Sequence, residues 1–300
     1  MSRSYGTVGI VGATGFIGRA LGRELSARGW RVVRFSRQPL EEGAWRSAAG
    51  KLDLGGLDAV VNLAGESVAQ RWTRSRWERI ENSRVELTRG LVQAIEQMAS
   101  CERPRVLLNS SAVGIYPSSE DEELREDSAL GTGRMAGLCR AWEAAALEAR
   151  NLGLRVVPLR TGIVLGKGGD AWERLRMLFS WGLGGRLGSG QQWMPWIHLA
   201  DEVAAIIFAL ESEDLSGPLN LCAPNPVTNR EFTKRLGGTL DRPAFCHAPG
   251  PLLSLILGGF AKEGLLASCR ALPVGLEEQG FNFKFPTLQS ALDDLRSSRD

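Results

Sequence analysis

Histidine, tyrosine and closely spaced cysteines are scarce in this chain, and each shortage excludes a kind of site. Among 300 residues there are two histidines and two tyrosines, so a metal site built from histidines is not expected. The five cysteines are scattered and form no Cys-x-x-Cys pair, which argues against a disulfide framework and against a zinc site. We therefore predict no bound metal.

The chain also has no long apolar run and no excess of charge of one sign. Its longest apolar run, residues 252–260, is shorter than the roughly 20 residues that a membrane helix needs, and no leader-like segment opens the sequence. The 36 basic and 34 acidic residues give a net charge of +2, too near neutral to favour nucleic acid or an anionic membrane. We expect a soluble, cytoplasmic protein that binds neither nucleic acid nor membrane.

Short apolar runs alternate with helical periods through the first half of the chain. Strands are predicted over residues 8–11, 31–35, 59–63, 105–108 and 154–159, and helices over 16–28, 77–98 and 135–150. This alternation is typical of right-handed crossovers that cover a parallel sheet on both faces. The predicted fold class is α/β, a Rossmann-type doubly wound parallel sheet.

The second half of the chain differs in composition, with a glycine-rich segment at 182–190 and several prolines beyond residue 217. A helix is predicted over 200–210 and a strand over 218–221. We predict a dinucleotide-binding domain over residues 1–166, with a segment that returns to it near 200–222. A smaller C-terminal cap, residues 167–300, would then cover the carboxyl ends of the strands, where open α/β sheets bind ligands.

A glycine-rich turn joins the first predicted strand to the first predicted helix. Gly12 permits the tight turn, Gly15 lets the backbone approach a diphosphate, and Gly18 lets the helix pack close to the sheet. Glycines also occur in plain turns, but the strand–turn–helix context favours a dinucleotide site. The expected contacts to the cofactor in this turn come from Gly12, Thr14, Gly15, Phe16 and Ile17.

The residues after the second predicted strand indicate which dinucleotide is bound. An NAD-binding chain usually has Asp or Glu there, to accept a hydrogen bond from the ribose 2′-hydroxyl. This chain has Ser36 and Arg37 instead, and a guanidinium binds a 2′-phosphate whereas a carboxylate repels it. We predict NADP, the alternative being that Arg37 is only a solvated arginine at a strand end.

Several further segments resemble one family. They are Val61-Asn62-Leu63-Ala64-Gly65-Glu66, Ser83-Arg84, Ser110-Ser111-Ala112-Val113-Gly114-Ile115-Tyr116, Trp142-Glu143-Ala144-Ala145, Arg160-Thr161-Gly162-Ile163-Val164-Leu165-Gly166, Gly188-Ser189-Gly190-Gln191-Gln192-Trp193, Trp196-Ile197-His198, Pro224-Asn225-Pro226-Val227-Thr228-Asn229 and Gly280-Phe281-Asn282-Phe283. Together they are similar to the atypical extended short-chain dehydrogenase/reductases usually labelled "epimerase family protein", which resemble NAD-dependent epimerases and dehydratases and end in a domain of unknown function. The resemblance runs from Val8 to about Leu295.

The resemblance implies further cofactor contacts and a mode of assembly. Leu63, Ala64 and Gly65 would lie under the adenosine and ribose, and Val164 beside the nicotinamide. The other cofactor-binding residues it implies are Ser110, Glu66 and Arg84. For Arg84 an ion pair with Glu81 or Glu86 on the helix surface remains the alternative. Extended members often form homodimers, which here would use the helices over 77–98 and 135–150.

The Tyr-x-x-x-Lys pair that carries the chemistry in short-chain dehydrogenases is missing. The two tyrosines are Tyr5 and Tyr116, and no lysine lies between Lys51 and Lys167. The serine of the usual site is present as Ser111. The replacement for the pair is left open among Tyr116, Glu143 and His198. The alternatives are that Tyr116 packs against the cap and that His198 is a half-buried structural histidine.

Two functions are consistent with these residues. The first is an NADP-dependent oxidoreductase or epimerase that acts on an unidentified small carbonyl compound or sugar nucleotide. The alternative is a catalytically degenerate NADP-binding protein that regulates through protein–protein contacts.

Overall fold

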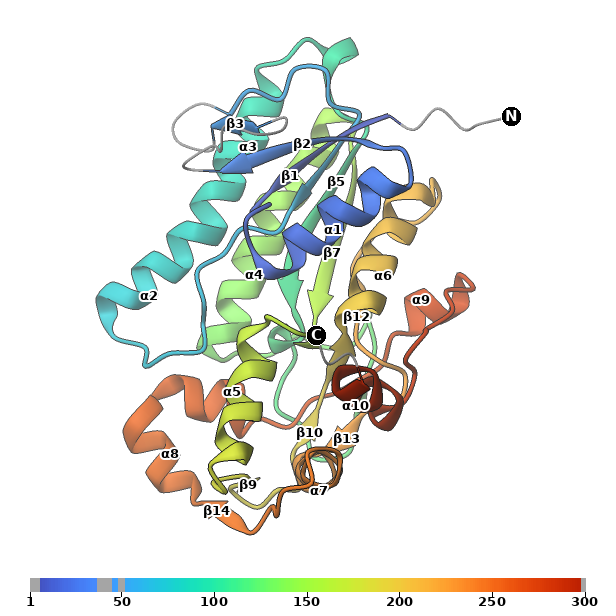
Figure 1. Ribbon diagram of the computed structural model, residues 1–300. Coiled ribbons are helices and arrows are strands. Elements are labelled where there is room, and N and C mark those ends of the chain that lie inside the picture. The colour runs from blue at the N-terminus through green and yellow to red at the C-terminus, as the bar shows by residue number, and fades with distance from the viewer. Residues whose placement is uncertain (1–5, 37–44, 48–51, 298–300) are drawn as a thin grey trace.

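The central sheet of the protein is parallel throughout the part of the chain that the structure describes. In this computed structural model the described residues are 6–36, 45–47 and 52–297. Seven of their strands form one sheet in the order β12-β7-β5-β4-β1-β2-β3 (Figure 1). Their bounds are β1 Thr7–Val11, β2 Arg31–Ser36, β3 Trp45–Ser47, β4 Ala59–Asn62, β5 Val106–Ala112, β7 Arg155–Thr161 and β12 Leu219–Leu221. The predicted α/β doubly wound fold is confirmed.

The strand order reverses at β1, and this reversal positions the site. β1 pairs in parallel with β2 on one side and with β4 on the other, with Ile10 opposite both Arg34 and Val61. The chain therefore leaves the carboxyl ends of β1 and β4 in opposite directions, which opens a crevice between them. Val8 and Ile10 are fully buried, as expected for a strand covered on both faces.

Two pairs of helices cover the sheet. α1 (Phe16–Ala27) and α6 (Leu199–Glu211) lie on one face, and α3 (Leu87–Glu96) and α4 (Arg134–Leu147) on the other (Figure 1). Helical spacing explains the packing of α1, because Leu21 and Leu25 are four residues apart and both are fully buried against the sheet.

The long helix predicted over 77–98 is in fact interrupted. α2 (Arg74–Glu81) and α3 are separated by a π-helical turn, η1 (Asn82–Glu86). At this turn the Ser83 hydroxyl donates to the carbonyl of Ile80 (2.9 Å) and accepts from the backbone N–H of Glu66 (2.9 Å). Such side-chain bonds compete with the regular helical ladder and mark a local widening.

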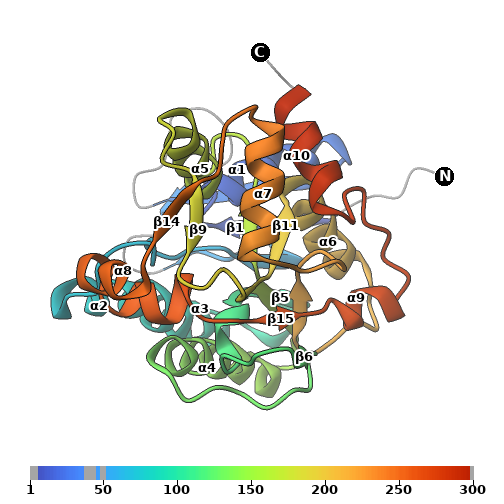
Figure 2. The same ribbon diagram turned by 90° about the horizontal axis from the view of Figure 1, so that it is seen from below.

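The C-terminal elements lie beyond the carboxyl ends of the sheet strands (Figures 1 and 2). Most are short and pair locally, as β9 does with β14 and β8 with β11. Their bounds, with β6 from the first half, are β6 Glu123–Leu124, β8 Ile163–Leu165, α5 Asp170–Ser180, β9 Gly185–Leu187, β10 Trp193–Met194, β11 Trp196–His198, β13 Val227–Thr228, α7 Asn229–Thr239, β14 Cys246–Ala248, α8 Gly250–Leu257, η5 Ala261–Leu265, β15 Arg270–Ala271, α9 Val274–Glu278 and α10 Leu288–Ser297.

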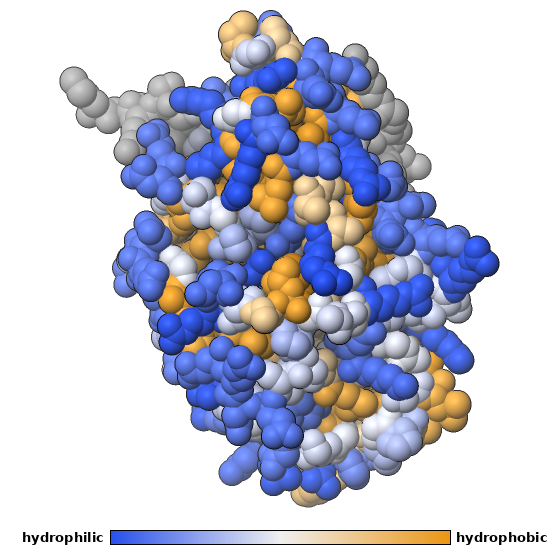
Figure 3. Space-filling view, turned by 180° about the vertical axis from the view of Figure 1, so that it is seen from behind, coloured by the Kyte–Doolittle hydropathy of each residue, from blue (hydrophilic) through white to orange (hydrophobic). Residues whose placement is uncertain are grey.

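On the face drawn in Figure 3 the surface is mainly polar, with apolar side chains in scattered groups. Among the described residues, no helix has the length and apolar character needed to span a membrane.

Candidate functional site

The glycine turn closes tightly over the end of β4. Gly12 has φ +86°, and a Cβ atom on it would lie 2.9 Å from the backbone N of Ala64. A Cβ on Gly18 would collide with the carbonyl oxygen of Gly12. Gly15 donates to that same carbonyl (3.0 Å) and begins α1 without a side-chain cap. The first N–H groups of α1 are therefore left for a ligand, and the turn fits a diphosphate.

The residues on either side of Gly15 have different surroundings. Thr14 is exposed, whereas Ile17 is half-buried and packs on the core of the α1 face. The ring of Phe16 lies against the loop after β8, because Cβ atoms on Gly166 and Gly169 would come within 2.7 and 2.6 Å of it. This contact joins the start of α1 to the loop that follows Val164.

A buried polar cluster supports the segment after β4. The amide nitrogen of Asn62 donates to Thr88 Oγ1 (3.0 Å) and to Asn109 Oδ1 (2.7 Å), and its oxygen accepts from the N–H of Ala64 (3.2 Å). Trp142 Nε1 also donates to Thr88 (3.0 Å). Sequence reasoning assigned no role to this cluster, although an asparagine directly after an apolar run, at residue 62 in β4 and at residue 109 in β5, is the signal for it. The cluster fixes Leu63, Ala64 and Gly65 beside the glycine turn.

The remaining predicted cofactor residues that the structure describes lie along the same edge. Ser36 ends β2, half-buried, and Arg37 lies outside the described residues. Ser110 is half-buried near the carboxyl end of β5. The Glu66 carboxylate forms an exposed ion pair with Arg79 (3.2 Å), and its carbonyl accepts from Arg84 (2.8 Å).

Three of the four predicted catalytic residues meet in one buried network. Ser111 donates to Glu143 Oε1 (2.6 Å), and Arg160 binds both oxygens of that carboxylate, at 2.9 and 3.0 Å. The Tyr116 hydroxyl accepts from Arg160 (2.9 Å) and donates to Asn220 Oδ1 (2.7 Å). Sequence reasoning missed Arg160 and Asn220, which come from β7 and β12.

This network limits what its members can do chemically. Burial raises the pKa of Tyr116 well above its usual value, although Arg160 opposes the rise. Both Glu143 oxygens are bound within the protein. Since the Ser111 hydrogen points to Glu143, its oxygen is left to accept rather than donate.

His198 caps α6 and belongs to no part of this network. Its Nδ1 accepts from the N–H of Ala200 (3.2 Å), and its ring packs on Phe285 with centroids 4.1 Å apart. The side chain is buried, and burial lowers its pKa to about 4, although Asp294 opposes the shift. The imidazole is therefore neutral at physiological pH.

Glu202 is a buried acid that sequence reasoning did not single out. It stands in the first turn of α6, 1% exposed, and Thr161 donates to its Oε1 (2.9 Å). Its other oxygen has no partner among the described residues. Burial raises its pKa to about 8, so the carboxyl is mostly protonated at neutral pH.

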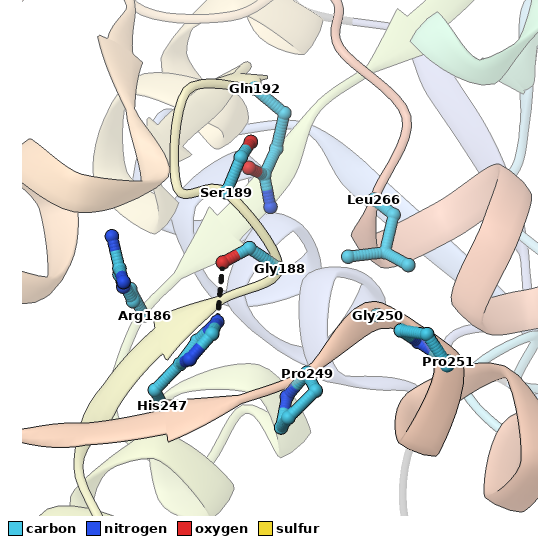
Figure 4. A pocket seen from close by; sticks show the side chains of 9 residues that line it. All are labelled: Arg186, Gly188, Ser189, Gln192, His247, Pro249, Gly250, Pro251 and Leu266. Carbon is cyan, nitrogen blue, oxygen red and sulfur yellow. Dashed lines mark hydrogen bonds between the residues drawn. The ribbon is translucent and has the colours of Figure 1, made fainter.

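An open pocket of 510 Å³ lies in the C-terminal part, between β9, β14 and the start of α8. His247 contacts the Gly188 carbonyl (2.8 Å) across it, as Figure 4 shows. Pro249, Pro251 and Leu266 make part of the wall apolar, and Arg186 and Gln192 add polar groups. Arg186, Gly188 and Ser189 of the glycine-rich segment 182–190 border this pocket. Within the segment, β9 pairs in parallel with β14.

The model of the NAD dependent epimerase/dehydratase family matches residues 8–222. The chain belongs to this family. A second model, a domain of unknown function, matches residues 248–295. The predicted family resemblance is thereby confirmed, including its C-terminal domain.

Curated relatives cover nearly the whole chain. The epimerase family protein MT2273 of Mycobacterium tuberculosis is 42% identical over 292 residues, which are 95% of this chain and 96% of that protein. The human epimerase family protein SDR39U1 is 37% identical over 291 residues, 95% of this chain and 97% of its own.

Two solved structures of the family match the fold closely. Human SDR39U1 (isoform 2), crystallised with NADPH, has a TM-score of 0.89 at 34% identity, covering 98% of this chain and 100% of that one. A nucleoside-diphosphate sugar epimerase from Corynebacterium glutamicum has a TM-score of 0.81 at 32% identity, covering 98% of this chain and 58% of that one.

Proposed function

We propose that this chain binds NADP and acts as an oxidoreductase or epimerase on a small carbonyl compound or sugar nucleotide whose identity is open. The observation that carries the proposal is the turn at Gly12, Gly15 and Gly18, which has no room for a side chain at Gly12 or Gly18 and leaves the start of α1 without a side-chain cap. The NADPH in the crystal structure of human SDR39U1 supports the same cofactor class for this chain.

The phosphorylated dinucleotide is preferred over NAD in this proposal because of Ser36 and Arg37. The guanidinium of Arg37 would pair with the 2′-phosphate, which a carboxylate at that position would repel. When bound, NADP supplies the hydride acceptor or donor of the reaction.

Ser111 is the residue that we propose contacts the substrate. Glu143 accepts its hydrogen bond, and Arg160 holds Glu143 in place, so the Ser111 oxygen has a fixed orientation. Tyr116 and Glu143 then act as positioning residues, because their polar atoms are bound to neighbours within the protein. His198 positions the start of α6 in the same way.

A second function is favoured by the same network. Because Tyr116 and Glu143 are occupied internally, neither is poised to carry a proton to a substrate. A protein with this site could bind NADP and signal its binding through a contact surface, with no turnover.

Absorbance of NADPH distinguishes the two functions. Purified protein is incubated with NADPH and panels of carbonyl compounds and sugar nucleotides, and cofactor oxidation is followed over time. Turnover that falls at least roughly 10-fold in Ser111→Ala supports the oxidoreductase, since such a loss corresponds to one hydrogen bond that Ser111 would accept from a substrate hydroxyl. Tight NADPH binding with no oxidation and no epimerised product supports the regulator.

A further inference from the structure

The exposed apolar side chains of the protein gather in its C-terminal part. Of the nine large apolar side chains that are exposed in the described chain, all but Leu130 belong to this part. Single exposed apolar residues are common on soluble proteins, whereas a group of them marks an interaction site. We call this group the apolar surface, and its members lie in and after α5, before β14 and in α8: Met177, Leu178, Trp181, Leu183, Phe245, Leu252, Leu255 and Ile256.

α8 has the composition of a buried helix, yet it lies at the surface. Its eight residues include one polar side chain, Ser254, and no charge, and none of them is buried. Leu252, Leu255 and Ile256 are three and four residues apart, so they share one side of the helix, and each is half exposed or more. A helix that is apolar on all sides is usually covered. The outer side of α8 has no such cover in the part of the chain that the structure describes.

α5 and the residue after it carry a second exposed apolar stripe. Met177, Leu178 and Trp181 follow Arg174 by three, four and seven residues, so these four side chains share one side of the helix. The Arg174 guanidinium donates to the carbonyl of Ala69 (3.1 Å). The stripe of α5 therefore lies on the side of the protein that carries the loop before α2.

Short contacts bring α8 and β14 to the same side. The chain after α8 returns to the loop before α2, because a Cβ atom on Gly258 would lie 3.8 Å from Arg71 Cγ. Leu183 and Phe245 precede β9 and β14 at the same end of the pair, since these two strands run parallel. Figures 1 and 2 show α5, β14 and α8 along one side of the C-terminal part.

The rim of the apolar surface is basic. Arg71 and Arg174 lie beside α8 and α5, as described above. Arg242 precedes Phe245 by three residues, and Lys262 follows the end of α8 by five. All four basic side chains belong to exposed residues, and none of them forms an ion pair with an acidic side chain among the residues that the structure describes.

The acidic side chains of the same segments are bound within the protein or lie at a distance. Glu173 and Asp241 form ion pairs with arginines, at 3.0 and 2.7 Å. Glu263 accepts a hydrogen bond from a backbone N–H at the start of α4 (2.8 Å). Asp170 stands at the opposite end of α5 from Trp181. The charges that the rim offers to a ligand are therefore mainly positive.

An anionic bilayer fits this surface better than a second protein does. Phe245 is 89% exposed and Trp181 67%, so both rings project from the protein. Projecting aromatic rings with basic neighbours are typical of side chains at a membrane interface. A specific protein interface needs about one hydrogen bond per 100–200 Å², and α8 offers only the side chain of Ser254. Two copies related by a two-fold axis would bring the same basic rim face to face, which repulsion disfavours.

We propose that the apolar surface docks on an anionic lipid membrane. Trp181, Phe245 and the outer side of α8 would enter the boundary between headgroups and acyl chains, and the basic rim would contact the anionic headgroups. This inference is independent of the proposed binding of NADP. The prediction from sequence that the chain binds no membrane rested on its net charge of +2, which averages over all faces of the molecule.

Vesicle flotation with the full chain tests the inference. Vesicles of phosphatidylcholine with about 30% phosphatidylglycerol should bind the protein. Vesicles of phosphatidylcholine alone should bind it at least roughly 10-fold more weakly, because the rim loses its electrostatic attraction. Raising the NaCl concentration from about 0.05 to about 0.5 M should weaken binding to the mixed vesicles, since salt screens the same attraction.

Matched variants identify the surface that binds. Phe245→Ser combined with Leu255→Ser should lower partition into the mixed vesicles at least roughly 10-fold, because two apolar side chains no longer leave water. Arg242→Gln combined with Lys262→Gln should lower it roughly 10-fold and leave the weak partition into neutral vesicles unchanged. Leu130→Ser removes the exposed apolar side chain outside the surface and should alter neither. Each variant should melt like the parent, because every side chain changed is exposed.

Three results of the flotation experiment overturn the inference. They are no binding of the parent to the mixed vesicles, equal binding to both kinds of vesicle, and an equal loss in Leu130→Ser. A fourth result would come from sedimentation in solution. Concentration-dependent dimers of the parent that Phe245→Ser with Leu255→Ser abolishes would assign the apolar surface to a second copy of the chain and overturn the membrane assignment.

Discussion

Arg160 holds both oxygens of the Glu143 carboxylate, at 2.9 and 3.0 Å, across the interior between β7 and α4. The two side chains are 5% and 8% exposed. Charged groups this deeply buried destabilise the folded protein unless they are paired. Each member of this pair is therefore needed for stability because it compensates the charge of the other.

Removing Arg160 should leave the charge of Glu143 buried and unpaired. Arg160→Met is expected to lower the free energy of unfolding by about 3–5 kcal/mol, because Glu143 would stay buried without its cation. Urea denaturation at neutral pH measures the change. Arg235→Met, which breaks the exposed pair with Glu231, is the control and should cost less than about 1 kcal/mol. Equal effects of the two substitutions would contradict this interpretation.

Glu202 should make the protein less stable as pH rises. Its pKa is about 8 in the folded state, against 4.5 when unfolded, so its favourable contribution is complete below pH 4.5 and is lost toward pH 8. Glu202→Gln keeps an acceptor for Thr161 and does not titrate. Between pH 5 and pH 8 the free energy of unfolding of the parent should fall by roughly 2–4 kcal/mol relative to that of the variant. A constant difference between them would show that Glu202 is ionised in the folded protein.

His198 should have the opposite pH dependence. Its pKa falls from 6.5 when unfolded to about 4 in the folded protein, so the unfolded chain binds more protons and stability drops as pH falls between these values. His198→Asn retains a helix-capping side chain and removes the titration. Between pH 7 and pH 4.5 the free energy of unfolding, measured by melting, should fall by up to roughly 3 kcal/mol more in the parent than in the variant. Parallel losses would mean that the imidazole is solvated.

Two glycine-to-alanine substitutions should change the stability of the protein in opposite directions. Gly18→Ala places a methyl group against the Gly12 carbonyl and should destabilise the protein by about 1–3 kcal/mol, a typical cost of overpacking. Gly137→Ala lies in α4 with no atom within 4 Å of the new methyl, and should stabilise by about 0.5–1 kcal/mol. Thermal melts of both variants provide the comparison, and destabilisation by Gly137→Ala would show that the space beside α4 is filled.

Periodicity alone predicted most of the sheet and its helices. The helix predicted over 16–28 spans Phe16–Ala27, and the strand predicted over 218–221 spans Leu219–Leu221. The π-helical turn was missed because it depends on the bond between Ser83 and the backbone of Glu66, 17 residues away. The short strand β6 was not predicted, because it lies in an acidic stretch, and Leu124 in it is buried beside Ala271 of β15.

Sequence motifs predicted which residues belong to the site, but not the hydrogen bonds that join them. Ser111, Tyr116 and Glu143 could each be named from sequence, but the group that joins them, Arg160, follows a run of four apolar residues (156–159) in β7. Which side chains a buried arginine meets is decided by how α4 packs on β7 and by the strands beside it. That information is tertiary, so neither spacing nor composition contains it.

Calorimetric titration of the full chain with NADPH and with NADH tests the central claim most directly. We predict saturable one-to-one binding of NADPH, at least roughly 10-fold tighter than NADH, with the preference reduced in Arg37→Ala because the 2′-phosphate loses its charged partner. Folded protein that releases no binding heat with either dinucleotide would contradict the account.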